Sequence, residues 1–489
     1  MYFNGKESKS GNKLKISGLY TDFYQLSMSQ AYYLSGREKE MAIFDYFFRK
    51  LPFEGGYAVF AGLETLLEQL ENLRFKEEDL EYLAANGFDP KFLKYLRDFK
   101  FKGSLYSSME GDLVYPTRPV VVVEATLIEA QLLETLLLNF LNYQTLIATK
   151  ASRIRQAAGE GTLIDFGMRR AHGPAAIHAS RAAIIGGFNA TSNVEAAKRY
   201  NIPASGTMAH SFVQSFDDEL EAFRNYAEKW PENCILLADT YDTLKSGLPN
   251  AIRVAKEMEK KEQRLKGIRL DSGDLAFLAR KSRELLDDAG LQYVQIAASN
   301  QLDEYVIRSL LEQEAPIDVF GVGTSMVTGQ PDAALDGVYK LASTSYKPRI
   351  KLSETISKIT LPSKKQVHRI YNGEQMALGA ECISHWEEQE VDLMFHPFEP
   401  GKFLRFSNYT TEPLLHKVME GGNRMLPARS LEEISNYSQK RLEQLPLEYK
   451  RFENPHLYKI GLSRDLKESR DKLIATYSKK KSNAGPGTY

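Results

Sequence analysis

The sequence predicts an α/β protein whose central part is a parallel sheet built from repeated βα units. Over residues 160–345 short apolar runs alternate with amphipathic helical stretches, which is the pattern of strands joined by helical crossovers. Polar clusters follow most of these apolar runs directly. In a (β/α) barrel or an open parallel sheet, that position is the carboxyl edge, where ligands bind. A chain of 489 residues is also long enough for two or three domains.

Five segments are expected along the chain. Residues 1–13 are polar and expected to be loose, and 14–150 are expected to form an N-terminal α/β domain. Residues 151–345 form the predicted (β/α) domain, and 346–477 form a C-terminal region expected to pack on both. The tail 478–489 combines lysines with Gly and Pro and is predicted to be disordered.

The strands are predicted from β-branched, aromatic and apolar runs. In the N-terminal domain they are expected at 43–48 and 119–125, and the apolar stretch 127–146 predicts one long buried helix. In the (β/α) domain the predicted strands are 163–166, 234–238, 267–270, 293–297 and 317–320.

Helices of the (β/α) domain are indicated by caps and by apolar stripes. Asp274 is a good N-cap, and leucines recur at helical spacing after it until Gly290. A second helix is expected after Asp303 and before Pro316. The stripe from Leu220 to Trp230 predicts another helix with a buried face.

Composition excludes several classes of protein. With 63 basic and 64 acidic residues, the net charge of −1 gives no electrostatic case for nucleic acid or an anionic membrane. The two cysteines, Cys234 and Cys382, have no metal-ligand spacing, which excludes a Cys-rich zinc site. No apolar stretch resembles a signal peptide or reaches the length of a membrane span, so a cytoplasmic protein is expected.

The segment Asp271-Ser272-Gly273-Asp274 follows a strand that carries Arg269. Carboxylates and a hydroxyl at a strand end suit Mg²⁺ or ribose hydroxyls, although such a turn also serves to cap the next helix.

Gly321, Gly323 and Thr324 follow another predicted strand, where backbone N–H groups at a helix start can bind phosphate. The ATP-binding P-loop pattern is absent from the chain, so ATP would have to bind without it.

His210, Arg169 and a pair of aspartates occupy further strand-to-helix junctions. Small residues precede His210, and an imidazole there can act as acid, base or nucleophile, including toward a phosphoryl group. Arg169 and its neighbour could clamp a carboxylate or phosphate. Asp239 and Asp242 could hold a metal or a hydroxyl, or could simply cap a helix.

Six segments in this order carry a resemblance to a known family: TDFYQ (21–25), NYQTLIATK (142–150), FGMRR (166–170), GTMAHS (206–211), LDSGD (270–274) and GVGT (321–324). Together they resemble the nicotinate phosphoribosyltransferase family over residues 18–345 and more weakly to about 460. The resemblance implies an irregular (β/α) barrel of the type II phosphoribosyltransferase kind. It also implies a homodimer whose active sites borrow residues from the neighbouring subunit.

The resemblance further implies a reaction and its participants. Nicotinate and phosphoribosyl pyrophosphate would give nicotinate mononucleotide and pyrophosphate, with Mg²⁺ as cofactor and ATP hydrolysed through a phosphohistidine at His210. The implied catalytic residues are His210, Asp239, Arg269 and Asp271, and the implied Mg²⁺ ligands are Asp239 and Asp242. The implied substrate-binding residues are Asp22, Tyr24, Arg169, Ser192, Ser211, Ser299, Asn300, Gly321, Gly323 and Thr324.

Two alternatives remain at this stage. The related nicotinamide enzyme has an acidic residue after the glycine pair that follows its second barrel strand. Residues 186–193, which include Ser192, contain no acid, and this absence favours the acidic substrate because a carboxylate would repel it. A non-catalytic binding protein on a degenerate barrel is disfavoured because His210, Asp271 and Arg169 are all retained.

Overall fold

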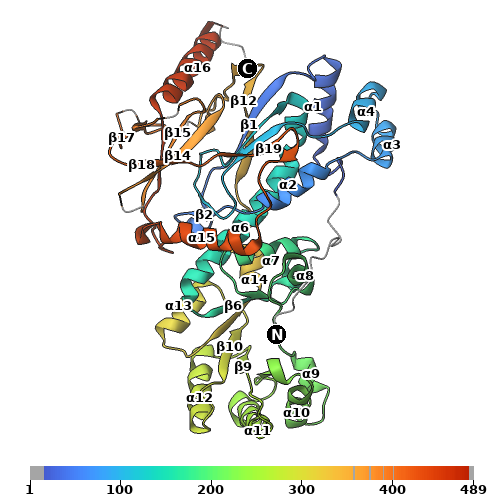
Figure 1. Ribbon diagram of the computed structural model, residues 1–489, viewed down its shortest axis with the longest axis vertical. Coiled ribbons are helices and arrows are strands. Elements are labelled where there is room, and N and C mark those ends of the chain that lie inside the picture. The colour runs from blue at the N-terminus through green and yellow to red at the C-terminus, as the bar shows by residue number, and fades with distance from the viewer. Residues whose placement is uncertain (1–15, 356–357, 374–375, 389, 400, 484–489) are drawn as a thin grey trace. The chain divides into compact units, whose positions relative to one another are not determined.

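The computed structural model describes residues 16–483 except 356–357, 374–375, 389 and 400 (Figure 1). The segment 1–13, expected to be loose, and residues 484–489 of the tail lie outside the described residues. The chain divides into two compact units: unit 1 holds residues 1–146 and 334–489, and unit 2 holds 147–333. Within the described part of the chain, no helix combines the length and the hydrophobicity needed to cross a bilayer.

Unit 1 contains a seven-stranded antiparallel sheet in the order β13-β12-β1-β5-β3-β19-β20. Its strands are β1 (Met41–Phe48), β3 (Ser104–Ser107), β5 (Val121–Thr126), β12 (Gly337–Thr344), β13 (Lys347–Pro348), β19 (His416–Glu420) and β20 (Asn423–Arg424). The predicted strands at 43–48 and 119–125 are therefore confirmed as β1 and β5. β12 pairs with β1 across nearly its full length, which brings the chain after unit 2 back into this sheet.

The helices of the N-terminal part of unit 1 share one hydrophobic core with this sheet. They are α1 (Phe23–Leu34), α2 (Leu63–Asn72), α3 (Glu77–Ala85), α4 (Pro90–Arg97), α5 (Leu127–Leu132) and the first part of α6 (Glu134–Ala158). The single helix predicted at 127–146 is wrong in one respect, because the chain breaks at Leu133 between α5 and α6. A capping box between Thr126 and Glu129 begins α5 directly at the end of β5.

A second sheet of unit 1 is formed entirely by the C-terminal region, in the order β17-β16-β21-β15-β14-β18. Its strands are β14 (Lys365–Tyr371), β15 (Ala377–His385), β16 (Leu393–Phe395), β17 (Phe403–Arg405), β18 (Thr410–Pro413) and β21 (Lys459–Leu462). The strands β2 (Ala58–Val59) and β4 (Leu113–Val114) form a separate pair, and α15 (Leu431–Glu443) contacts β4. α16 (Arg464–Asn483) lies beside β15, as Figure 1 shows, and also contacts β16. It continues through 478–483, where disorder was expected.

Unit 2 is built on a six-stranded parallel sheet in the order β7-β6-β11-β10-β9-β8. The strands are β6 (Thr162–Asp165), β7 (Ala190–Thr191), β8 (Ile235–Leu237), β9 (Gly267–Leu270), β10 (Gln295–Ser299) and β11 (Val319–Val322). Among the described residues no ladder joins β7 to β8, and a single bridge from Thr191 to Ala204 extends the β7 edge. The predicted α/β class with a parallel βα core is confirmed.

Helices separate these strands, and Figure 1 shows α12 beside β9 and β10. They are α7 (Ala175–Ile185), α8 (Val194–Tyr200), α9 (His210–Gln214), α10 (Glu219–Lys229), α11 (Leu248–Glu259), α12 (Leu275–Asp288), α13 (Glu304–Glu312) and α14 (Thr324–Thr328). The predicted cap at Asp274 is confirmed, because its carboxylate accepts a hydrogen bond from a first-turn amide of α12. The helix expected after Asp303 is confirmed as α13, and the Asp303 carboxylate caps it in the same way. Trp230, predicted to be part of a buried stripe, is instead 56% exposed because α10 ends before it.

Two strands begin and end about two residues later than predicted. β10 runs to Ser299 and β11 to Val322, so Ser299 and Gly321 are ladder partners rather than loop residues. The sequence misplaced these ends because Ser299 is polar and Gly321 is a glycine, both of which normally weaken a strand assignment. Contacts with distant residues allow both positions in a strand: Arg269 bonds to Ser299, and the Phe166 ring packs against Gly321.

Candidate active site

The carboxyl ends of the six parallel strands of unit 2 all lie at one edge of the sheet, so polar residues at those ends come together. Eight residues form a connected group there, which we call the site network: Thr207, His210, Asp239, Thr240, Arg269, Asp271, Ser272 and Ser299.

Arg269 is the centre of the site network. It lies on β9, and its Nη2 donates to Asp271 Oδ1 at 2.6 Å while Nε donates to Ser299 Oγ at 2.8 Å. Its Nη1 donates to Thr207 Oγ1 at 3.0 Å, and the guanidinium carbon lies 5.3 Å from the centroid of the Phe166 ring. The side chain is only 15% exposed, so these contacts hold the guanidinium in one orientation.

The two carboxylate oxygens of Asp271 face different neighbours. Its Oδ1 accepts hydrogen bonds from Arg269 and Ser299, and its Oδ2 lies 3.8 Å from His210 Nε2. Burial raises the pKa of this carboxyl, but the Ser299 hydrogen bond and the Arg269 charge outweigh burial and hold the pKa below its usual value. A carboxylate therefore faces His210 at neutral pH.

His210 is the first residue of α9 and its side chain is 40% exposed. Its Nδ1 lies 3.2 Å from Thr240 Oγ1, on the loop after β8. The ring is thus held on two sides, by Thr240 and by Asp271, and still reaches solvent. A histidine in this position can accept a group that arrives from outside.

The two carboxylate oxygens of Asp239 differ in their hydrogen bonding. Its Oδ2 accepts hydrogen bonds from the Asp271 amide at 2.9 Å and from Ser272 Oγ at 2.6 Å. Its Oδ1 is buried and has no hydrogen-bond partner within the described part of the chain. A bound cation or a ligand hydroxyl would satisfy this oxygen.

Asp242, the other predicted metal ligand, has a different local role. Its carboxylate caps the short helix that follows by accepting from the amides of Leu244 and Lys245. The hydrogen bonds from the Lys245 and Leu244 amides, together with the Lys245 charge, hold the pKa of this carboxyl below its usual value. No three His, Cys, Asp or Glu side chains gather as a metal site among the residues that the structure describes.

Arg169 lies on a short 3₁₀ turn (Met168–Arg170) that a buried carboxylate holds in place. Asp165, at the end of β6, accepts from the Gly167 amide at 2.7 Å and from the hydroxyls of Ser180 and Thr191, each at 2.7 Å. Arg169 itself is exposed, and no ion pair to it occurs within the described residues. The turn therefore presents a guanidinium that can pair with an anionic ligand.

The two glycines of the predicted phosphate loop differ in their surroundings. Gly321 lies inside β11, and a Cβ there would come within 2.4 Å of the Phe166 ring, so this glycine makes room for that ring. The prediction that Gly321 belongs to the loop is wrong for this reason. Gly323 does lie at the turn into α14, where the exposed Thr324 begins the helix.

Asn300 follows Ser299 in a left-handed conformation, with φ of 79°, and the next residue, Gln301, is also left-handed at 51°. Two consecutive non-glycine residues of this kind are strained, and such strain is common at ligand sites. Ser192 is half-buried after β7, where its amide donates to the Asp165 carbonyl at 2.9 Å, and Ser211 is exposed on α9.

The predicted residues of the N-terminal motif belong to unit 1. Asp22 precedes α1 and accepts a hydrogen bond from Thr135 Oγ1 at 2.6 Å, which fixes the start of that helix. Tyr24 on the first turn is 47% exposed, and its neighbour Phe23 is 66% exposed. Burial raises the pKa of the Tyr24 hydroxyl, so the residue is a neutral aromatic surface at physiological pH.

Sequence reasoning missed four residues that hold the site network together or support it. Thr207 and Phe166 lie inside motifs that drew attention to other residues, and Thr240 stands between the two predicted aspartates. Ser272 had been noted only as part of its motif. Hydroxyls of this kind are common in every loop, so no signal short of the folded geometry marks them as partners.

The sequence of this chain is similar to that of known proteins over most of its length. Residues 19–142 match the nicotinate phosphoribosyltransferase (NAPRTase) N-terminal domain, 162–375 the nicotinate phosphoribosyltransferase (NAPRTase) family and 364–470 the nicotinate phosphoribosyltransferase C-terminal domain. The chain is 47% identical to the nicotinate phosphoribosyltransferase of Bacillus subtilis, over 91% of this chain and 93% of the relative.

Solved structures are similar as well. Human nicotinic acid phosphoribosyltransferase has a TM-score of 0.83 and 30% sequence identity, covering 93% of this chain and 99% of the human one. A nicotinate-nucleotide pyrophosphorylase from Pyrococcus furiosus shares the fold, with a TM-score of 0.69 at 24% identity over 87% of this chain and 95% of that one. These similarities confirm the predicted fold, with its N-terminal domain and C-terminal extension.

Proposed function

This chain belongs to the nicotinate phosphoribosyltransferase family, and from that membership we propose the reaction and the residues that perform it. Nicotinate attacks C1 of the ribose of phosphoribosyl pyrophosphate, giving nicotinate mononucleotide and pyrophosphate for NAD biosynthesis. The observation that carries the proposal is the site network, in which a held arginine and an ionised aspartate face an accessible histidine.

The chemical step forms a bond between the pyridine nitrogen and ribose C1 and breaks the bond from C1 to pyrophosphate. Positive charge develops on the ribose as the leaving group departs. Asp271 is ionised at neutral pH and already oriented by Arg269 and Ser299, so its carboxylate can stabilise this charge without reorganising. Arg269 keeps that carboxylate in place.

The ends of the substrates are assigned to groups around the same sheet edge. Arg169, exposed and without an ion pair in the described chain, pairs with the nicotinate carboxylate. Backbone amides at Asn300, Gly323 and Thr324 receive the phosphate groups. Ser192 stands where an acidic residue would repel nicotinate, so the end of β7 accepts a negatively charged base.

His210 is proposed to couple ATP hydrolysis to this reaction. If Nδ1 carries the proton and donates to Thr240 Oγ1, Nε2 keeps its lone pair and can attack the γ-phosphorus of ATP. The bond from Nε2 to phosphorus forms as the bond to ADP breaks, and water later releases phosphate from the histidine. The negative phosphoryl group would stand beside the positively charged ribose and strengthen binding of the substrate.

Mg²⁺ fits the donor set at this edge, since Asp239 Oδ1 is a buried carboxylate oxygen that lacks a partner among the residues that the structure describes. Asp239, and Asp242 on the same loop, would hold the ion, which neutralises the charge of the departing pyrophosphate. Few protein ligands suffice because Mg²⁺ sites commonly take further oxygens from substrate phosphates and water.

Tyr24 is proposed to stack on the pyridine ring, supplied by the neighbouring subunit of a homodimer. Its exposed ring beside Phe23 is an aromatic surface on α1 that a flat base can cover. Mixing subunits that carry Tyr24→Ala with subunits that carry His210→Ala tests this assignment. Recovery of ATP-stimulated activity in the mixture supports a shared site, and no such recovery contradicts it.

The direct test is product formation from phosphoribosyl pyrophosphate and Mg²⁺ with nicotinate or nicotinamide, each with and without ATP. We expect nicotinate mononucleotide to form in preference and faster with ATP. Preferential turnover of nicotinamide would move the chain to the sister activity and overturn the assignment of Ser192. No product from either base would favour a non-catalytic binding protein.

A further inference from the structure

The turn that joins β10 to α13 has an unusual backbone conformation. Asn300 and Gln301 are both left-handed, with φ of 79° and 51°, although neither is a glycine. No backbone carbonyl among the described residues accepts a hydrogen bond from either of their amides. Successive amides of this kind can bind an anion, but a strained turn persists only where the surrounding structure holds it.

Side chains hold the first half of this turn. Ser299 Oγ, at the end of β10, accepts a hydrogen bond from Arg269 Nε at 2.8 Å and donates to Asp271. Leu302 is 1% exposed, and its carbonyl accepts a hydrogen bond from Ser325 Oγ of α14 at 2.5 Å. The turn is therefore fixed where it begins and in its middle.

Two buried cations hold the far end of the turn, where α13 begins. Glu304 is the first residue of α13, and its Oε2 pairs with Lys150 Nζ while its Oε1 pairs with Arg153 Nε at 2.9 Å. Arg153 Nη2 also donates to the Tyr305 hydroxyl at 3.1 Å. We call Lys150, Arg153 and Glu304 the anchor triad. All three are at most 3% exposed, and the two cations lie on the part of α6 that belongs to unit 2.

Buried charges are a costly way to join two helices. Apolar side chains of similar volume would hold α6 and α13 together without removing charges from water. Ion pairs with hydrogen bonds add direction, because they fix the angle between the groups as well as their distance. The anchor triad therefore fixes the first residue of α13 more closely than apolar packing would.

We propose that the anchor triad positions the turn 300–303 to bind a phosphate group of phosphoribosyl pyrophosphate. The turn has only four residues, so a shift of Glu304 would displace the amides of Asn300 and Gln301. The residues of the anchor triad are too deeply buried to touch the substrate, so they are positioning residues. The inference rests on the proposed function, in which this turn receives substrate phosphate.

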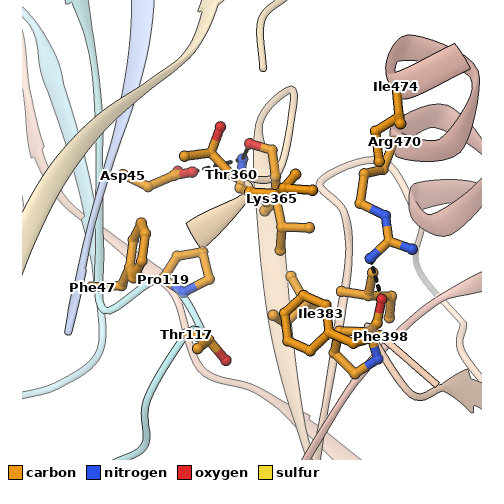
Figure 2. A pocket seen from close by; sticks show the side chains of 14 residues that line it. Asp45, Phe47, Thr117, Pro119, Thr360, Lys365, Ile383, Phe398, Arg470 and Ile474 are labelled. Atoms are coloured by element: carbon orange, nitrogen blue, oxygen red, sulfur yellow. Dashed lines mark hydrogen bonds and ion pairs between the residues drawn. The ribbon is translucent and has the colours of Figure 1, made fainter. Parts of the chain in front are cut away.

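A buried ion pair in unit 1 provides a control. Lys365 Nζ lies 2.8 Å from Asp45 Oδ2, and both side chains are at most 5% exposed. The pair joins β14 to β1 beside a cavity of about 160 Å³, which no residue of the turn or of the site network lines (Figure 2). Its loss should lower the stability of the fold without weakening phosphate binding.

The test is calorimetric titration of the full chain with phosphoribosyl pyrophosphate and Mg²⁺. Arg153→Met leaves Lys150 paired with Glu304 but loosens the start of α13, so the dissociation constant should rise at least about tenfold. Arg153→Lys keeps a cation beside Glu304 and should restore most of the affinity. KM for nicotinate should hardly change in either variant, because Arg169, to which we assign the base, lies on another loop.

Asp45→Asn removes the charge from the control pair and should leave the dissociation constant unchanged. An unchanged constant in Arg153→Met, or an equal rise in Asp45→Asn, would overturn the inference. Lys150→Met, which removes the other cation, serves as a second variant should Arg153→Met fail to fold.

The same titrations separate the inference from the proposed function. If the wild-type chain binds phosphoribosyl pyrophosphate but forms no product from either base, the proposed function is wrong. The comparison of dissociation constants then still decides whether the anchor triad positions the turn. A wild-type chain that does not bind phosphoribosyl pyrophosphate at all would contradict both.

Discussion

Each unit of this protein contains a cluster of charged side chains, and the two clusters differ in how deeply they are buried and how completely their charges are paired. In unit 1 a group that we call the charge cluster comprises Asp112, Arg118, Arg369, Glu381 and Arg441, and each of these side chains is at most 8% exposed. In unit 2 the site network leaves His210 40% exposed and Asp271 27% exposed. Similar residue types thus form a sealed structural group in one unit and an open group in the other.

The contacts explain the difference. Arg369 bonds to Asp112 at 2.6 Å and to Glu381 at 2.8 Å, so its charge is balanced from two sides inside the protein. Arg118 Nε and Glu381 Oε2 make no well-aligned hydrogen bond, but they lie 2.9 Å apart and their opposite charges pair. In the site network Asp239 Oδ1 has no partner among the described residues, and Nε2 of His210 faces a carboxylate at 3.8 Å. A buried cluster whose charges are all paired stabilises the fold, and an open group with an accessible ring and an unpaired carboxylate oxygen can bind a ligand.

The largest effect is expected for Glu381→Ala in the charge cluster. Removing this carboxylate leaves Arg118 buried without its ion-pair partner and Arg369 with Asp112 alone, so the free energy of unfolding should fall by about 3–5 kcal/mol. Denaturant titration measures the change. Glu77→Ala, in an exposed pair with Arg97, is the matched control and should have almost no effect. Equal effects of the two substitutions would contradict the distinction between buried and exposed pairs.

The next effect concerns activity rather than stability. Asp271→Asn keeps the shape of the site network but removes the carboxylate charge, so kcat/KM should fall by about 10²–10³-fold while the unfolding transition shifts only slightly. Steady-state kinetics and a melting curve on the same preparation measure both. Asp287→Asn in a surface pair on α12 is the control. A variant that loses stability but keeps its rate would show that the site network is structural.

His210→Ala should remove the acceleration by ATP and leave the rate that the wild-type enzyme shows without ATP. The expected loss is about 5- to 150-fold, the usual range of coupling between two binding events. Incubation with γ-labelled ATP should give no labelled protein for this variant. Unchanged stimulation by ATP in His210→Ala would disprove the phosphohistidine.

A smaller effect is expected at Thr240, which holds His210 Nδ1 at 3.2 Å. Thr240→Val keeps the side-chain shape but loses the hydroxyl, so phosphorylation of the histidine should slow by about 2- to 10-fold. Thr240→Ser should restore the rate. The reaction without ATP should not change in either variant, and a parallel loss there would show that Thr240 acts on the fold instead.

The smallest effect is a pH dependence of stability. The folded pKa of Asp271 is held below its unfolded value of about 3.9, so its contribution is fully present above that pH. The contribution is lost as the pH falls through the lower folded pKa. The stability difference between wild type and Asp271→Asn should therefore be constant from pH 7 to about pH 4 and shrink below it. A difference that is already lost near pH 6 would contradict the lowered pKa.

Much of the (β/α) unit was predictable because its signals are local. The strand over 267–270, the cap Asp274 and the helix after Asp303 were found where expected, since apolar runs and capping side chains act within a few residues. The ends of β10 and β11 were misplaced because their residues depend on distant partners. Ser299 accepts a hydrogen bond from Arg269, 30 residues away in sequence, and Gly321 leaves space for the ring of Phe166. Interactions of that range leave no mark on the local pattern.

The sequence by itself determined the family, the parallel core and the positions where polar side chains leave each strand. It did so because periodicity, caps and ordered motifs are properties of neighbouring residues. Only the tertiary structure decided which hydroxyls support the site network and that the chain after unit 2 returns to pair β12 with β1. It alone also brought Asp45 and Lys365 together beside a cavity, because 320 residues separate them in the chain and contacts of that kind depend on the whole fold.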